Sequence, residues 1–196
     1  FAATIATVFM TFGAAWGSVF LQKAFSISSQ QAASCASFVF IGAIPGSFFF
    51  GWFSGFIKKR KLPMIIGGTG ALASYLLLVY GIGESVMLAR ICLFGMGFFG
   101  CGNVVAYALG NDLSPCGGEG VGLGFVNTLL IGGGAGFGPI IGLLLDSQHG
   151  PAKSASDYTI AEMHFAFLPL TICLCISFLS SLLIKETHCQ KTPVAK

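Results

Sequence analysis

Six long apolar stretches, separated by short polar segments, are the feature that most constrains how this chain can fold. A helix that crosses a bilayer needs roughly 20 mainly apolar residues. Only 9% of the residues are charged, whereas soluble domains carry about 25%. We therefore predict an all-α membrane protein with a six-helix bundle over residues 1–184 and a polar tail over 185–196. The predicted spans are residues 3–21, 32–57, 63–80, 86–109, 121–145 and 163–184.

The basic residues are divided unequally between the two ends of such a bundle. One end carries Lys58, Lys59, Arg60, Lys61, Lys185, Lys191 and Lys196, and the other carries Lys23 and Lys153. Short cytoplasmic loops hold the excess of Lys and Arg. We therefore predict a multi-pass membrane protein with both chain ends in the cytoplasm. We expect the membrane to be a bacterial inner (plasma) membrane. The basic run at residues 58–61 fixes this orientation; binding of anionic lipid headgroups is its alternative role.

Several functional classes have no support in the sequence. A net charge of +3 is too small to predict a nucleic-acid partner. His149, His164 and His188 lie in separate regions, and no HExxH or GxSxG pattern occurs. The glycines of GMGFFG follow no predicted strand, so we interpret them as a helix-packing face. The sequence predicts no enzyme, no metal site and no cofactor.

Two of the predicted spans contain helix breakers. Pro45 lies in the second span, and Gly138, Pro139 and Gly142 lie in the fifth. Proline removes a backbone hydrogen bond, and transporters place such weak points beside their pathways. These residues are therefore candidates for gating, although small residues at a spacing of four also favour ordinary helix packing.

A few polar and aromatic side chains within the spans are candidates for solute contact. Asn103 and Tyr107 are four residues apart and share a helical face. Asn127 should point into the bundle to avoid lipid; its alternative role is a hydrogen bond between helices. Trp16 belongs to an aromatic stripe with a residue four positions away on either side, and this stripe could instead serve packing or lipid contact.

Charged groups within the predicted spans are rare. Arg90 is a candidate for gating or coupling, because an ionisable group in lipid is costly, but it could also extend to the outer interface. No Asp or Glu lies deep in any predicted span. If transport is coupled to protons, we expect the coupling carboxylate to lie in another part of the protein.

Three stretches resemble signatures of the major facilitator superfamily. GWFSGFIKKRK is similar to the glycine-acid-basic loop between the second and third helices of each half; Gly51 and the basic run fit, whereas Gly55 stands where the acid is expected. ARICLFGMGFFGCG places Arg90 in an Arg-then-glycines pattern. GAGFGPIIG is similar to a signature best known from antiporters. The ending LLIKETHCQK resembles a superfamily C-terminus.

The resemblance implies that this chain is the C-terminal six-helix half of a transporter and that its partner is a missing N-terminal six-helix half. It also implies alternating access, with the first, fourth and fifth helices contributing to a central solute site. Our leading hypothesis is proton-coupled uptake (symport) of a small organic solute such as an amino acid, a peptide or a similar metabolite. The alternatives are a drug or metabolite efflux antiporter and, from another class, a membrane scaffold or sensor that transports nothing.

Overall fold

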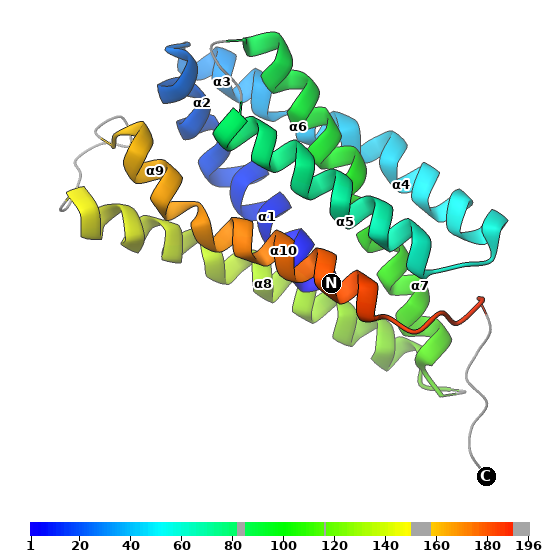
Figure 1. Ribbon diagram of the computed structural model, residues 1–196. Coiled ribbons are helices and arrows are strands. Elements are labelled where there is room, and N and C mark those ends of the chain that lie inside the picture. The colour runs from blue at the N-terminus through cyan, green and yellow to red at the C-terminus, as the bar shows by residue number, and fades with distance from the viewer. Residues whose placement is uncertain (82–84, 116, 150–157, 190–196) are drawn as a thin grey trace.

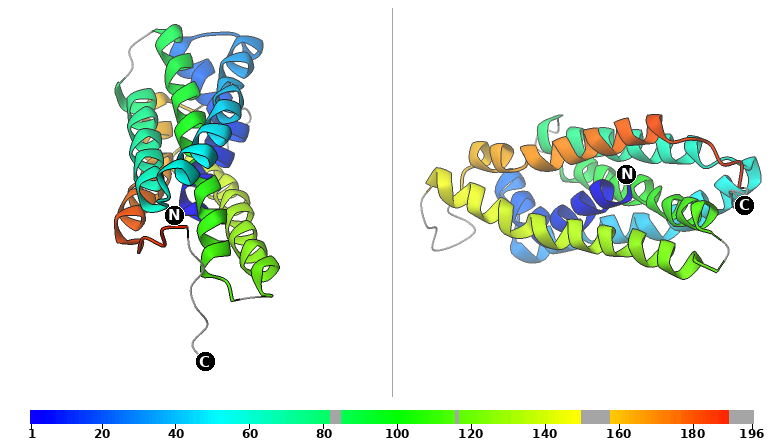
Figure 2. Two further views of the ribbon diagram at one scale, coloured as in Figure 1. Left: turned by 90° about the vertical axis from the view of Figure 1, so that its right-hand side faces the viewer. Right: turned by 90° about the horizontal axis from the view of Figure 1, so that it is seen from below.

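A computed structural model describes residues 1–81, 85–115, 117–149 and 158–189 of the 196-residue chain. All secondary structure in these ranges is helical, and the helices pack side by side in one elongated bundle in all three views (Figure 1 and Figure 2). Six helical segments are long and apolar enough to cross a membrane: Ala2–Phe25, Ser29–Ile57, Lys61–Gly81, Val86–Leu113, Glu119–Gln148 and Ile160–Leu183. The predicted all-α, six-helix membrane bundle is therefore confirmed.

The first segment contains an unusually wide turn. It consists of α1 (Ala2–Val8), a π-helical stretch η1 (Phe9–Trp16) and α2 (Gly17–Phe25). The second segment consists of α3 (Ser29–Ala36) and α4 (Phe38–Ile57). Pi-helical turns occur frequently at functional sites, and this one lies within the helix that the resemblance assigns to the solute site.

The middle segments are also divided. The third comprises α5 (Lys61–Leu76) and a short π-helical end, η2 (Leu77–Gly81). The fourth comprises α6 (Val86–Gly100) and α7 (Asn103–Leu113). Residues 82–84 and Cys116 lie outside the described part.

The last two segments differ in length. The helix α8 (Glu119–His149) is continuous through Pro139, as α4 is through its own proline, Pro45. The sixth segment comprises α9 (Ile160–Ala166) and α10 (Leu168–Leu183). Residues 150–157, which include Lys153, and residues 190–196 lie outside the described ranges.

Close approach between α4 and α6 depends on glycine. A methyl group at Gly42 would collide with the carbonyl of Phe94, and one at Gly97 would collide with the carbonyl of Val39. Small residues allow membrane helices to pack with their backbones in contact. The glycine pattern of GMGFFG therefore serves packing, as the sequence predicted.

An aromatic cluster fills the core where the first, third and sixth segments meet. The Phe12 ring lies 5.6 Å from Tyr75 and 5.4 Å from Phe167 between ring centroids, and Phe20 lies 5.7 Å from Phe167. The Tyr75 hydroxyl donates to the Phe167 carbonyl at 3.2 Å. Phe12 and Phe20, two members of the predicted aromatic stripe, are therefore core residues. The third member, Trp16, points toward α8.

Candidate functional site

A polar pair joins the fourth and fifth membrane segments. The Tyr107 hydroxyl on α7 donates to Asn127 Oδ1 on α8 at 2.8 Å. Asn127 is exposed in this bundle, and Asn103 lies half-buried one helical turn before Tyr107. With its oxygen bonded to Tyr107, the Asn127 amide still presents two N–H donors. This pair can hydrogen-bond an uncharged or acceptor-rich part of a solute.

A second set of contacts joins the first segment to the glycine-proline region of α8. Trp16 Nε1 donates to the Gly138 carbonyl at 3.2 Å, and Thr11 Oγ1 donates to the Gly134 carbonyl at 3.4 Å. A methyl group at Gly142 would lie 3.5 Å from the Trp16 ring. The π-helical stretch therefore holds α8 on both sides of the position where Pro139 removes a backbone donor.

These two sets do not form one compact site. Asn127 and Gly138 are 11 residues apart on α8, which corresponds to about 16 Å along a helix. The predicted pathway residues Tyr107 and Asn127 are brought together, whereas Trp16 lies with Gly138 and Gly142, two of the predicted gating residues. Sequence reasoning missed Thr11, whose only signal was a hydroxyl within an apolar span.

The remaining gating candidates lie on other parts of the bundle. Arg90 Nε donates to Cys35 Sγ at 3.3 Å, and its guanidinium carbon lies 5.7 Å from the centroid of the Phe38 ring. Arg90 therefore joins α6 to α3 and the start of α4. Pro45 and Gly51 lie on the exposed face of α4, and a methyl group at Gly51 would meet open space.

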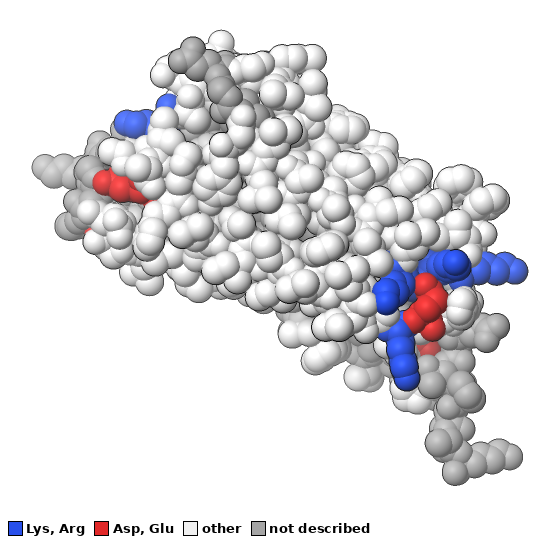
Figure 3. Space-filling model, viewed as in Figure 1, with Lys and Arg blue, Asp and Glu red and all other residues white. Residues whose placement is uncertain are grey.

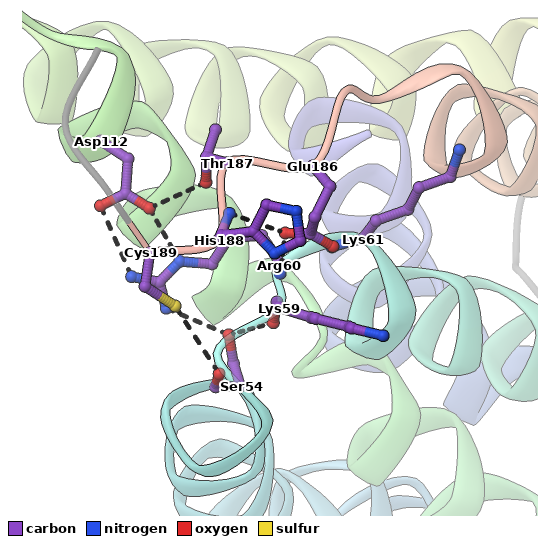
Figure 4. Close-up of polar contacts among 9 residues, drawn as sticks. All are labelled: Ser54, Lys59, Arg60, Lys61, Asp112, Glu186, Thr187, His188 and Cys189. Atoms are coloured by element: carbon purple, nitrogen blue, oxygen red, sulfur yellow. Dashed lines mark hydrogen bonds and ion pairs between the residues drawn. The ribbon is translucent and has the colours of Figure 1, made fainter. Parts of the chain in front are cut away.

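A charged cluster lies at the end where α4 turns into α5 (Figure 4). Arg60 Nε lies 2.9 Å from Asp112 Oδ2, and its Nη1 donates to Ser54 Oγ at 3.0 Å. The side chains of Arg60 and Asp112 are only 14% and 7% exposed. This ion pair links the basic turn to the last turn of α7.

The segment after α10 crosses the same cluster. Glu186 accepts hydrogen bonds from the backbone N–H groups of Arg60, at 2.6 Å, and Lys61, at 3.0 Å. Thr187 Oγ1 donates to Asp112 Oδ2 at 3.2 Å, and the Cys189 thiol donates to the Ser54 carbonyl. We call residues 184–189 the strap, because they join three helix ends.

Glu186 is held in its charged form. Partial burial raises the pKa of this carboxyl group, but N–H donors from Arg60, Lys61 and His188 outweigh that effect, so its pKa lies below the ordinary value. The carboxylate also lies at the N-terminus of α5, where unpaired backbone donors favour an anion.

The acid that the loop signature lacks is supplied from elsewhere in the chain. A methyl group at Gly55 would meet open space, so this position lies away from the cluster. Asp112 and Glu186 provide the carboxylates that hold Arg60 and the start of α5. Both acids were visible in the sequence at the ends of predicted spans, but neither was predicted as a partner of the basic run.

An apolar groove of about 730 Å³ opens at the same end of the bundle. Its walls include Met64, Leu109, Leu113, Val121 and Ile184, and no charged side chain among the described residues lines it. The groove therefore offers shape and apolar surface, and the polar contacts available to a solute come from the α7–α8 pair instead.

Charge is confined to the two ends of the face shown in Figure 3, with a broad uncharged belt between them. Together with the six apolar segments, this defines a multi-pass integral membrane protein. Residues 1–194 match the family model of the Major Facilitator Superfamily. The chain therefore belongs to this superfamily of membrane transporters, and the resemblance seen in the sequence is confirmed. No curated protein and no solved structure matches the chain.

Proposed function

We propose that this chain is one six-helix half of a secondary active transporter that carries a small organic solute by alternating access. The solute is an amino acid, a peptide or a similar metabolite. One observation carries this proposal beyond family membership: Tyr107 and Asn127 form a hydrogen-bonded pair on adjacent spans. Polar groups within a membrane bundle are costly unless they have a partner or serve a pathway.

The exposed face of α8 supports a second six-helix half as the partner. Phe125 and Leu143 on α8 are 65% and 70% exposed. Gly132 and Gly136 also present an open backbone on α8. In this arrangement the solute passes between the halves, against the α7–α8 wall.

Proton coupling is assigned to the other half. Among the described residues of this chain, the buried carboxylate is that of Asp112, and it pairs with Arg60 at one end of the bundle. A proton carrier in the middle of the pathway would be expected to be an unpaired carboxylate or a histidine. The basic end faces the cytoplasm of a bacterial inner membrane, in line with the positive-inside rule.

Solute counterflow into proteoliposomes tests this proposal. The chain is reconstituted together with a six-helix half that completes the transporter and is supplied with labelled amino acids, peptides and other metabolites, with and without an imposed proton gradient. We expect Tyr107→Phe and Asn127→Leu to lower counterflow of the accepted solute about tenfold, which corresponds to roughly 1.4 kcal/mol of lost contact. Leu179→Ala, on the exposed face of α10, is the control. A completed transporter that ignores every solute and every gradient would exclude transport.

Efflux by antiport is the second candidate. The observation that favours it is the arrangement of Gly134, Gly138, Pro139 and Gly142 on α8, with Trp16 bonded to the Gly138 carbonyl. Deletion of the gene distinguishes the two directions, because loss of an exporter lowers resistance to a toxic compound, whereas loss of an importer lowers uptake of a nutrient.

A further inference from the structure

Among the described residues, four lysines at the basic end take no part in the Arg60–Asp112 ion pair. Arg60 is paired with Asp112, and Glu186 is bonded to backbone N–H groups. Within the described ranges no carboxylate forms an ion pair with the other cations of this end. These cations, which we call the basic patch, are Lys58, Lys59, Lys61 and Lys185.

The backbone brings the basic patch together from two distant parts of the sequence. The helix α4 ends at Ile57, and Lys58 takes a left-handed conformation with φ of 51°, which reverses the chain. Glu186 then holds the strap against the first backbone N–H groups of α5, which places Lys185 beside this turn. Figure 3 shows the resulting group of basic side chains around a few acidic atoms at one end of the molecule.

Each part of the patch has an exposed apolar neighbour. Phe56, two residues before Lys58, is 72% exposed; Leu183, two residues before Lys185, is 86% exposed; and Leu62, directly after Lys61, is 43% exposed. A site for a soluble anion gains nothing from such neighbours. A phospholipid uses both kinds of group, because its phosphate meets the ammonium groups while its acyl chains cover the apolar side chains.

An aromatic pair marks the depth of the patch in the membrane. Trp52 and Phe56 lie one helical turn apart on α4, with ring centroids 5.3 Å apart and planes at 18°, and both rings are exposed. Exposed tryptophan is typical of the membrane interface. The lysines that follow therefore lie at the level of the lipid headgroups.

We propose that the basic patch binds the phosphate headgroups of anionic phospholipids, with Phe56, Leu62 and Leu183 in contact with their acyl chains. A lysine near a membrane surface strengthens attraction to an anionic headgroup about fivefold. This attraction should weaken at high salt, because charges separated by more than about 3 Å are screened at ~1 M ionic strength. The inference stands independently of the solute and of the direction of transport.

Quenching of Trp52 fluorescence by brominated lipid tests the proposal directly. The chain has two tryptophans, so Trp16→Phe leaves Trp52 as the only reporter. This variant is reconstituted in phosphatidylcholine vesicles that contain a small fixed fraction of brominated phosphatidylglycerol or of brominated phosphatidylcholine. We expect brominated phosphatidylglycerol to quench Trp52 more strongly than the same fraction of brominated phosphatidylcholine. The difference should correspond to a local concentration of phosphatidylglycerol around Trp52 that is about fivefold higher.

Matched variants separate the patch from general effects of the membrane. The excess quenching is the additional quenching of Trp52 by brominated phosphatidylglycerol over that by brominated phosphatidylcholine. Simultaneous replacement of Lys58, Lys59 and Lys185 by Gln should abolish this excess, whereas Lys23→Gln at the opposite end should preserve it. Trp52→Phe, which leaves Trp16 as reporter, should show little preference for either lipid.

Two results would overturn the lipid assignment. Equal quenching of Trp52 by the two brominated lipids would show that the patch does not concentrate anionic lipid. Loss of the excess on addition of inorganic phosphate at constant ionic strength would assign the patch to a free anion. If the triple variant does not incorporate into vesicles, the protein that retains the lysines is measured at ~1 M salt instead. Loss of the excess quenching at that salt concentration would then show that the attraction to the anionic lipid is electrostatic.

Discussion

Removing one partner of the Arg60–Asp112 ion pair should destabilise the bundle more than any other change of charge at the basic end. Arg60→Met leaves the Asp112 carboxylate 7% exposed with Thr187 as a hydrogen-bond donor. Breaking a buried pair costs about 3–5 kcal/mol. We expect about 2–3 kcal/mol here, because both side chains retain some contact with water. For a chain of this length, that corresponds to a fall of about 5–10 °C in the unfolding midpoint.

A double-mutant cycle measured by thermal unfolding in detergent separates the pair from its surroundings. Asp112→Asn alone should destabilise the protein, and the Arg60→Met/Asp112→Asn double variant should recover about 2 kcal/mol relative to the sum of the single changes. Lys59→Gln is the matched control in the same turn, and we expect it to change the free energy of unfolding by less than about 0.5 kcal/mol. Additive single effects, or an Arg60 variant as stable as the Lys59 control, would refute the reasoning.

Three further changes test other contacts. The folded pKa of Glu186 is lowered, so its stabilising contribution is present above the unfolded value of 4.5 and is lost as the pH falls through the folded pKa. The difference in unfolding midpoint between the parent and Glu186→Gln should therefore shrink below about pH 4.5. A difference that stays constant with pH would contradict this. Gly97→Ala should cost about 1–3 kcal/mol in thermal unfolding, because its methyl group would collide with the α4 backbone, whereas Gly55→Ala, in open space, should cost nothing. Trp16→Phe should lower stability by about 1 kcal/mol through loss of the bond to Gly138; an unchanged midpoint would show that this bond contributes nothing.

The membrane class and the number of helices could be predicted because hydropathy is a local property. Each span is a continuous run of apolar residues, and each polar interruption is visible in the sequence. The gathering of charge at one end was visible for the same reason. The basic run at residues 58–61 follows directly after an apolar span, and Lys185 follows another.

The partners of the polar side chains could not be predicted, because they depend on how distant helices pack. Arg60 meets Asp112, 52 residues away, and Glu186, 126 residues away. Trp16 and Thr11 donate to backbone carbonyls of α8. Every residue carries such a carbonyl, so nothing in the side-chain sequence distinguishes these acceptors.

The positions of the helix interruptions were equally hidden. The sequence indicated Pro45 and Pro139 as helix breakers, yet both lie inside continuous helices. The second and sixth segments are interrupted at Ser37 and Phe167 instead. Neighbouring helices in a membrane bundle can satisfy the backbone groups that a proline leaves free, so a proline alone does not locate a break.

The measurement that tests the central claim most directly is the water accessibility of position 127. Asn127→Cys is prepared in a chain whose seven native cysteines are replaced, with Ile176→Cys on the exposed face of α10 as the lipid-facing control. If the α7–α8 wall lines a solute pathway, a water-soluble, membrane-impermeant thiol reagent should modify position 127 in membranes that hold the completed transporter and should leave position 176 unmodified. Modification of position 127 only by a lipid-soluble reagent, as at position 176, would show that this wall faces lipid and would contradict the proposed pathway.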